Sequence, residues 1–261
     1  MVASLLFALV LLAPEPPPVE LKYRFAKGDI CVDATERSLQ LRLFAGTAIT
    51  KFHVDSERSL RRTVLEVDDE GEVASERVQV EKFLHVVKEH PEQEAATQPY
   101  ACHGKNYVWK RKRRGGFGLF DEGGEVTPKH PQLVECLQPW RAARLPSRPV
   151  RPGDTWEVSA ADFLRAAGQT VPKEVEGKCV FRLESVDGDG VARITFEFGH
   201  SQREENGRLL TGKNRGEWRF DTKRGRDLEF SMEGELRVDE GEGGDGSFRF
   251  RRVLTWEAGR S

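Results

Sequence analysis

The sequence predicts a mainly β protein with a minor helical part (α+β): a strongly curved antiparallel sheet, or half-barrel, with two short helices on its apolar face. Apolar and charged residues alternate with a period of two in most segments, which is typical of strands with one buried and one solvated face. Turns rich in Gly and Asp separate these segments at hairpin spacing. Helical spacing is confined to residues 128–138 and 159–167. A β-sandwich of two sheets satisfies the same pattern and is the alternative fold.

The composition indicates a folded domain without a strong net charge. Of the 261 residues, 38% are hydrophobic and 32% charged, and 15 Phe and 5 Trp supply large side chains for a core. The 41 Lys and Arg nearly balance the 43 Asp and Glu, so the charge predicts no nucleic-acid partner. A basic run at residues 109–114 (WKRKRR) is interpreted as the charged end of a hairpin that resists edge pairing.

The N-terminus has the composition of an export signal. Residues 1–13 are almost wholly apolar and carry no charge, and residues 14–18 (PEPPP) form a stiff polyproline spacer. The apolar run is too short to span a bilayer, and no later segment approaches that length. Although no Lys or Arg precedes the run, we expect a signal peptide and a soluble protein exported to the periplasm or the extracellular space. An apolar strand or a buried helix is the alternative.

The first half of the β domain, residues 19–144, has an irregular strand pattern. Residues 19–27 alternate and predict a half-buried opening strand. A hairpin is predicted around residues 68–71, and its second arm places apolar residues on one side until Lys82 interrupts the pattern. Thr-Pro then starts the helix predicted over residues 128–138. The apolar residues of the opening strand are Leu21, Tyr23 and Phe25.

A proline-rich connector, residues 145–156 (LPSRPVRPGDTW), separates the two halves. Its three prolines exclude a continuous helix and favour extended backbone before each of them. Pro152-Gly153 has the composition of a tight turn, because proline fixes one φ and glycine permits a positive φ at the next position. We expect this connector to dock the second run of antiparallel strands onto the first.

The second half, residues 157–258, has the clearer pattern. Ser159 is the expected N-cap of a short helix that ends at Gly168. Strands of regular alternation follow, and residues 187–190 (DGDG) predict a hairpin turn. Because the alternation is one-sided, each strand is expected to bury one face.

The four cysteines, Cys31, Cys102, Cys136 and Cys179, are widely separated. An even number in an exported chain is typical of disulfides, and four cysteines allow three connectivities. We favour Cys102–Cys136, whose members flank the first predicted helix, and this leaves Cys31–Cys179 to tie the two halves together. Free buried thiols are the alternative, and metal binding is disfavoured because no CxxC occurs.

No residue of the sequence is assigned a catalytic, cofactor-binding or metal-binding role. The HExxH, GxSxG, phosphate-loop and dinucleotide motifs are absent from the sequence. Cys102 and His103 are adjacent, but neighbours on a strand point to opposite faces, so a disulfide or an inert thiol is favoured over an activated one. The chain is therefore predicted not to be an enzyme.

A stripe of large apolar residues near the C-terminus is the candidate ligand-binding face. Such a face can line a cavity for an acyl chain, although an ordinary sheet core under the helices explains it too. Arg252 shares the alternation of the stripe, which requires a cavity mouth, a buried ion pair or a β-bulge. The candidate residues are Phe230, Met232, Leu236, Phe248, Phe250, Arg252 and Trp256.

Two segments resemble a family of exported bacterial proteins of unknown function. The connector PVRPGDTW, residues 149–156, has the form PVxxGDTW, and LKYRFAKGD, residues 21–29, has the form LxYxFxxGD. The later runs GKCVFRL, residues 177–183, and VARI, residues 191–194, fit the same family. The resemblance covers most of the chain after residue 18 and brings no catalytic residue. At the level of fold, the chain is more distantly similar to lipoprotein-carrier half-barrels of the LolA type.

These observations predict an exported, non-enzymatic envelope protein that binds or carries an apolar small molecule or lipid inside a curved sheet. The first alternative is a structural or protein–protein interaction module that uses exposed strand edges. The second alternative is a hydrolase built from some of the abundant carboxylates.

Overall fold

A computed structural model describes residues 16–45, 47–69, 71–88, 96–111, 117–126, 144–166, 171, 174–203, 208–239 and 243–257. Seven strands belong to the first half: β1 (Ile30–Ala45), β2 (Ala48–Val67), β3 (Val73–Lys88), β4 (Ala96–Pro99), β5 (Asn106–Arg111), β6 (Phe117–Asp121) and β7 (Gly124–Glu125). The second half contains β8 (Thr155–Ser159), helix α2 (Ala160–Ala166), β9 (Glu174–Val186), β10 (Val191–Arg203), β11 (Leu209–Asp221), β12 (Arg226–Asp239) and β13 (Gly244–Glu257).

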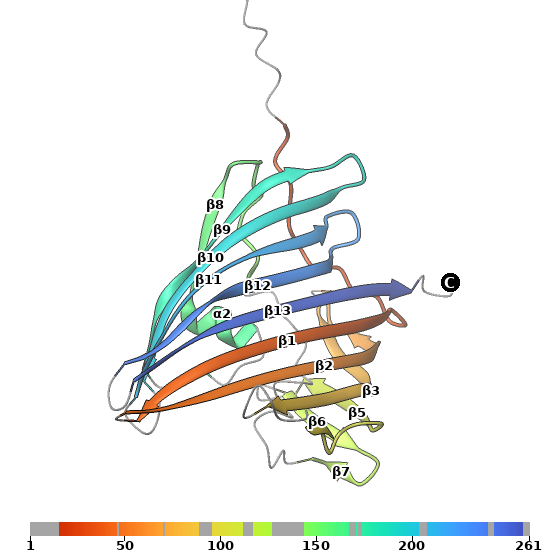
Figure 1. The fold of residues 1–261 in the computed structure, drawn as a ribbon. Coiled ribbons are helices and arrows are strands. Elements are labelled where there is room, and N and C mark those ends of the chain that lie inside the picture. Colours follow the sequence, from red (N-terminus) through yellow and green to blue (C-terminus); the bar gives the residue numbers. More distant parts are fainter. Residues whose placement is uncertain are drawn as a thin grey trace, which may run out of the picture.

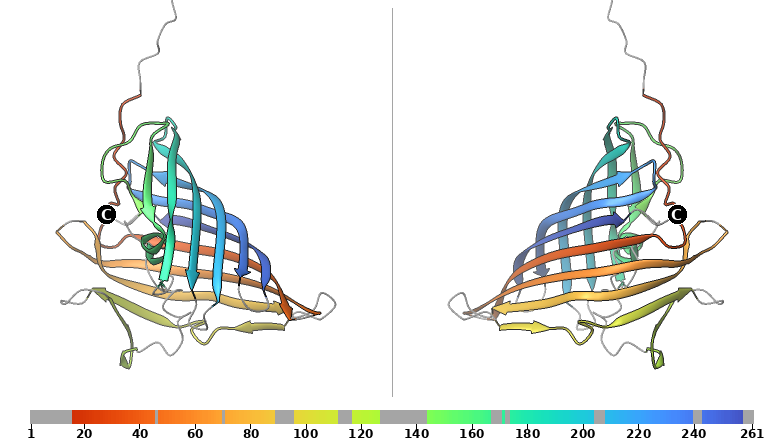
Figure 2. Two further views of the ribbon diagram at one scale, coloured as in Figure 1. Left: turned by 90° about the vertical axis from the view of Figure 1, so that its left-hand side faces the viewer. Right: turned by 90° about the vertical axis from the view of Figure 1, so that its right-hand side faces the viewer.

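The described strands form one antiparallel sheet of 13 strands (Figure 1). Their order is β7-β6-β5-β3-β2-β1-β13-β12-β11-β10-β9-β8, and β4 pairs with β3 beside this path. The strands near β9 run in a clearly different direction from those near β2, so the sheet is strongly twisted and curved (Figure 2). The predicted curved sheet is confirmed, and the two-sheet sandwich is wrong.

The two halves of the chain join through their outermost strands in sequence, β1 and β13. This pairing is antiparallel and unbroken from Ile30 opposite Glu257 to Leu43 opposite Gly244. Among the described strands, the path ends at β7 and β8, and β4, which pairs with β3 alone, is a third edge strand. The connector at residues 145–156 therefore leads to β8, at the edge of the sheet opposite β7.

Two apolar clusters lie on one face of the sheet, which we call the apolar face. The larger cluster is under α2, whose Phe163 and Leu164 pack against aromatic residues of β9–β12. The smaller cluster surrounds Leu60 and Val78 on β2 and β3. Figure 1 shows α2 lying behind the strands, on this face. The predicted helix over residues 159–167 is confirmed as α2, whereas residues 128–138 lie outside the described residues.

Gly216 shows how glycines let the apolar face bend. A Cβ atom on Gly216 would lie 2.2 Å from both the Phe196 ring and the Ser231 carbonyl oxygen. Phe196 leans across this position and stacks on Phe230, with ring centroids 4.8 Å apart, although β11 lies between their strands. A glycine in a strand interior is typical of such close approach and of sharp curvature.

The opening segment differs from the prediction. Residues 19–27 are extended, and Leu21 and Tyr23 are buried as the alternation predicted, but the segment is not a strand of the sheet. Its backbone instead forms an isolated bridge between Val19 and Val150 of the connector. The reason is that β1 already has β2 and β13 as partners, so the segment packs on the apolar face through its side chains.

The irregularity at Lys82 is a β-bulge. The β2–β3 register shifts there, with Leu60 opposite Val80 and Ser59 opposite Lys82. Before the bulge the inward residues of β3 are even-numbered, as are Val78 and Val80. The extra residue of the bulge reverses this, so the next inward residue is Phe83, which is buried. The predicted hairpin around residues 68–71 is confirmed, because β2 and β3 pair on either side of it.

The connector and the helix cap have their predicted local geometry. Gly153 has a φ of 95°, and the Asp154 amide donates to the Arg151 carbonyl oxygen at 2.9 Å, which closes the turn. The Ser159 hydroxyl accepts from the Asp162 amide at 3.1 Å and donates to the Asp162 carboxylate at 2.7 Å. This exchange resembles a capping box and starts α2.

The predicted disulfide Cys31–Cys179 is wrong. Cys31 and Cys179 are buried free thiols, as is Cys102, whose predicted partner Cys136 lies outside the described residues. Four strands separate β1 from β9, and a spacing of about 4.8 Å between neighbours puts them roughly 24 Å apart along the sheet. A disulfide requires Cα atoms within about 7 Å.

In the native protein these three thiols are expected to resist alkylation. Burial raises the pKa of each, that of Cys31 to about 12, and the thiolate is the nucleophile. Treatment with N-ethylmaleimide before and after unfolding in guanidinium, followed by peptide mass spectrometry, should label Cys31, Cys102 and Cys179 only in the unfolded chain. Native-state labelling at the rate of a free cysteine peptide would contradict this placement.

Candidate binding face of the sheet

The structure divides the predicted ligand-binding stripe on β12 and β13 into three parts. Phe230 and Phe250 are buried in the larger apolar cluster, at 1% and 5% exposure. Met232 and Phe248 are half-buried against that cluster, and Leu236 is half-buried farther along β12. Arg252 and Trp256 lie toward the opposite end of β13.

Arg252 forms a buried ion pair on the apolar face. Its Nε and Nη2 atoms donate to the two Asp33 carboxylate oxygens at 2.9 and 2.8 Å. The β1–β13 register runs through Arg252 without interruption, so no β-bulge explains its position. Of the three explanations for a charge on this face, the buried ion pair is therefore confirmed.

Asp33 is the centre of a larger charge cluster. Arg62 donates to Asp33 at 3.2 Å and to Glu76 at 2.5 Å, and Arg58 lies 3.7 Å from Asp33. Burial raises the pKa of the Asp33 carboxyl, but the Arg252 and Arg58 guanidiniums more than offset this and hold that pKa well below its usual range. Asp33 is fully buried, so the cluster is a buried structural element between the two apolar clusters.

A second buried charge cluster fixes the connector to the sheet. Asp227 accepts hydrogen bonds from the Tyr23 hydroxyl at 2.9 Å, the Trp218 indole at 2.8 Å and Arg144 at 3.0 Å. Arg144 is fully buried, and its guanidinium lies 4.7 and 5.0 Å from the ring centroids of Trp218 and Phe230. Burial raises the pKa of Tyr23, so the phenol stays protonated. Arg144, the residue before the connector, thus attaches this part of the chain to the apolar face.

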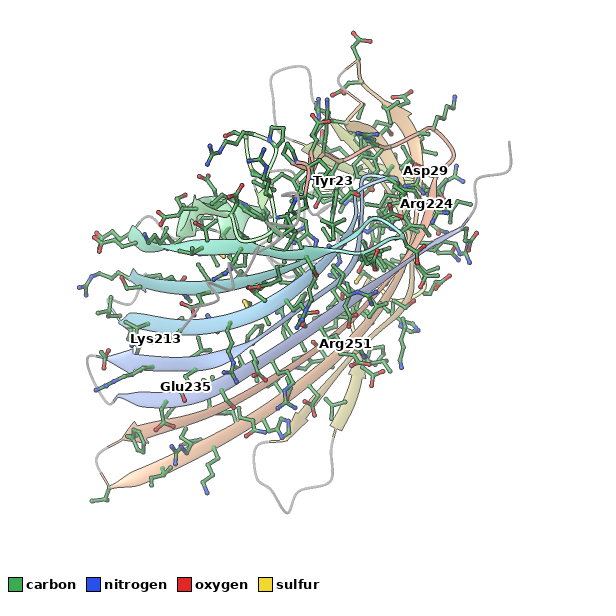
Figure 3. The ribbon with its side chains drawn as sticks, turned by 90° about the horizontal axis from the view of Figure 1, so that it is seen from above. Tyr23, Asp29, Lys213, Arg224, Glu235 and Arg251 are labelled. Atoms are coloured by element: carbon green, nitrogen blue, oxygen red, sulfur yellow. The ribbon has the colours of Figure 1, made fainter. Side chains whose placement is uncertain are left out.

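A small pocket of about 60 Å³ lies between the two charge clusters. Its lining includes Asp29, which accepts from Arg226 at 2.5 Å, and Trp256, whose ring lies 4.6 Å from the Arg226 guanidinium. Figure 3 shows Tyr23 and Asp29, two of its lining residues, at the same end of the sheet. About 30 Å³ is the share of one water molecule in the liquid, so this pocket is too small for an acyl chain.

Beyond α2, the apolar face continues as a band of half-buried apolar side chains, which we call the end strip. The strip crosses five neighbouring strands, from β11 through β12, β13 and β1 to β2. At about 4.8 Å between neighbours, its width is roughly 19 Å. Its members are Leu39, Leu41, Leu43, Phe52, Val54, Leu210, Leu236, Val238 and Phe248.

The opposite, polar face is hollowed by a trough. Three adjoining hollows of about 1120, 800 and 700 Å³ share lining residues of the polar face. Lys213, Glu235 and Arg251 lie on this face (Figure 3). Many charges in the trough are paired across strands, as are Arg251 with Glu229 and Arg215 with Glu233, at 2.9 Å each. Cross-strand ion pairs therefore balance much of the charge that lines the trough.

The other candidate groups of the sequence carry no reactive arrangement. The Nδ1 atom of His103 accepts a hydrogen bond from the Phe83 amide at 3.1 Å. Burial raises the pKa of the neighbouring Cys102 thiol. In the basic run, Arg111 pairs with Asp68 and Glu72 across the hairpin. Within the described ranges, no three His, Cys, Asp or Glu side chains gather as metal ligands would.

Sequence reasoning missed most of the two charge clusters. A signal for Asp33 and Arg62 was present, because each shares its alternation with an inward apolar residue, as Arg252 does. Arg144 had no such signal, since the connector has no period that would assign it a face. Its role depends on a contact with Asp227, 83 residues away.

Comparison with protein families and with curated proteins gives no match for this chain. Among solved structures, a lipovitellin structure titled for its lipid–protein interactions is similar over 91% of this chain, with a TM-score of 0.51 and 6% identity. This chain covers 26% of that one. A DynF structure from the dynemicin pathway of Micromonospora chersina has a TM-score of 0.24 at 9% identity, covering 91% of this chain and 85% of that chain. A DUF1329 family protein from Desulfovibrio piger has a TM-score of 0.14 at 12% identity, covering 90% and 88%.

At these sequence identities a similar structure indicates a similar fold and nothing more. TM-scores of 0.24 and 0.14 are too low to indicate even a similar fold. In the part of the chain that the structure describes, no helix has the length and apolar character needed to cross a bilayer. At a TM-score of 0.51 the chain shares the fold of part of lipovitellin, and in this chain that fold is one large curved antiparallel sheet.

Proposed function

We propose that this protein is an exported, non-enzymatic binder of an apolar ligand, and that an acyl chain of the ligand lies along the end strip. The observation that carries the proposal is the half-burial of the strip, which contrasts with the complete burial of the apolar residues under α2. A contiguous band of apolar side chains that the core does not fully cover is typical of a binding surface.

The size of the end strip supports an acyl chain. The strip is roughly 19 Å wide across its strands. One leaflet of a bilayer contributes about 15 Å of hydrocarbon, so a lipid chain can contact the strip over its length. The fold shared with part of lipovitellin, a protein whose structure is titled for lipid–protein interactions, supports the same class of ligand.

The alternatives receive less support from the described residues. An interaction module would need long open edges, whereas the edge strands β4, β7 and β8 have four, two and five residues. A hydrolase would need carboxylates in a cleft, whereas Asp33 and Asp227 are buried and bonded to neighbouring side chains.

Leu41→Gln is expected to weaken the binding of Nile red, a neutral apolar dye, by about tenfold, because a polar group then replaces a half-buried apolar contact of the strip. Arg42→Gln, one residue away on the polar face, is the matched control and should bind as the parent does. Fluorescence titration measures both affinities, and circular dichroism checks the fold. Equal affinity of Leu41→Gln and the parent, or no dye binding by the parent, would overturn the proposal.

A further inference from the structure

Two polar side chains on the apolar face, Asn214 and His200, have buried atoms without hydrogen-bond partners. Asn214 is 7% exposed, and its Oδ1 atom and the Nδ1 atom of His200 have no partner in the part of the chain that the structure describes. Arg252 and Arg144 of this face, in contrast, each donate to a buried carboxylate. A buried polar atom without a partner costs free energy, so a ligand or water is expected to supply one.

The two side chains lie close together and are held by their neighbours. Asn214 is opposite Phe198, and His200 is opposite Gly212. Asn214 and His200 are therefore diagonal neighbours on β11 and β10, a relation in which Cα atoms are about 7–8 Å apart. The His200 ring stacks on Phe198 with centroids 4.5 Å apart. It also covers Gly212, where a Cβ atom would lie 2.3 Å from the ring.

Asn214 has the same arrangement with the next strand. A Cβ atom on Gly234 would lie 2.3 Å from Asn214 Oδ1, so the amide extends over a position that only glycine leaves open. Beyond these glycines lie Leu236 and Phe248 of the end strip. Asn214 and His200 therefore border the strip on the side of the covered core, where Phe198 contacts Phe163 of α2 at 4.4 Å between ring centroids.

The chemistry of the pair is that of neutral hydrogen bonding. An amide oxygen accepts a hydrogen bond, and a neutral imidazole both donates and accepts. Burial lowers the pKa of His200, which favours the neutral ring at pH 7. The cross-strand neighbours on this face, Phe198, Gly212 and Gly234, bring no cation that would stabilise a bound carboxylate.

We propose that Asn214 and His200 form a subsite for the neutral hydroxyl head of an amphiphile whose hydrocarbon tail lies on the end strip. The ligand class is that of fatty alcohols and monoacylglycerols. The ligand hydroxyl donates to Asn214 Oδ1 and exchanges a second hydrogen bond with the His200 ring. This inference rests on the proposed function, because the tail needs the strip.

The test compares two ligands, in one of which a methyl group replaces the hydroxyl hydrogen of the other. 1-Decanol and decyl methyl ether each displace Nile red from the protein, and their displacement constants give a preference ratio. The parent protein is expected to prefer 1-decanol by about tenfold, since the ether cannot donate to Asn214. Asn214→Leu should bring the ratio to about one while dye binding persists. Thr211→Val, on the polar face of the same strand, should leave the ratio unchanged.

The outcomes separate this inference from the proposed function. If the parent binds no dye, the proposed function and this inference both fail. If dye binds but the parent shows no preference, or Asn214→Leu keeps it, only the subsite is wrong and water is the partner of these atoms. Should Asn214→Leu not fold, His200→Phe gives a second test, because a phenyl ring keeps the stacking on Phe198, and a preserved preference there would overturn the inference.

Discussion

Replacing Asp33 with asparagine is expected to destabilise the protein by about 3–5 kcal/mol. The substitution preserves the shape of the side chain but removes the negative charge that Arg252, Arg62 and Arg58 share. Uncompensated guanidinium charge would then remain buried between the two apolar clusters, which is far costlier than loss of an exposed pair. Urea unfolding followed by tryptophan fluorescence measures the change in the free energy of unfolding.

The matched control for Asp33→Asn is Glu233→Gln, which removes the carboxylate of an exposed ion pair with Arg215. Its expected cost is less than about 1 kcal/mol, because solvent screens both charges. Similar costs for the two variants would contradict the burial of the Asp33 charge cluster.

The same ion cluster predicts acid sensitivity. The pKa of Asp33 is held below its usual range in the folded state and is about 3.9 in the unfolded chain, so the unfolded state binds a proton first as the pH falls. The stabilising contribution of Asp33 is therefore complete above about pH 5 and declines as the pH falls below 4. The parent protein should lose more stability over this range than Asp33→Asn does.

Replacing Asp227 with asparagine is the second change with a large expected effect, again about 3–5 kcal/mol. Asp227 is the carboxylate to which Arg144, Tyr23 and Trp218 donate, and Arg144 is fully buried. Loss of the charge should also release the connector, because Arg144 attaches the connector to the sheet. Hydrogen exchange is expected to become faster in residues 144–150. The amides of β1 should exchange at the rate seen in the parent protein once urea has lowered the parent's stability to that of the variant.

A double-mutant cycle with Arg144→Met distinguishes this ion pair from general damage to the core. Methionine removes the buried cation, so the double variant should be more stable than the sum of the single effects predicts, by about 1–3 kcal/mol. Additive effects, within about 0.5 kcal/mol, would show that Arg144 and Asp227 do not interact.

The two charge clusters and the end strip divide the apolar face into parts with different roles. The Asp227 cluster lies where the opening segment, the connector and the sheet meet. The Asp33 cluster links β1, β2, β3 and β13 within the sheet. The proposed ligand surface lies beyond α2, where side chains of neighbouring strands extend over glycines of β11–β13. Anchoring and binding thus occupy opposite ends of the long strands.

The sequence by itself determined the fold class and much of the local structure. Alternation in strands such as β9 predicted that Cys179, Phe181 and Leu183 are buried, because a period of two depends only on the residues of one strand. The turn at Gly153 and the cap at Ser159 were predictable for the same reason, since each depends on residues within about one turn of chain. Arg252 on the apolar face left a cavity mouth, a buried ion pair and a β-bulge open, and the structure shows the ion pair with Asp33.

The tertiary structure alone decided how these elements combine. The pairing of β1 with β13 joins segments about 200 residues apart, and no local pattern specifies which edge a strand will meet. This pairing brought Arg252 to Asp33, and it left residues 19–27 outside the sheet although their alternation is that of a strand. Similarly, the two free thiols Cys31 and Cys179 were assigned to each other by counting alone, whereas four intervening strands keep them apart. Partners distant in sequence meet only through the global topology, so the charge clusters and the ligand face depend on it.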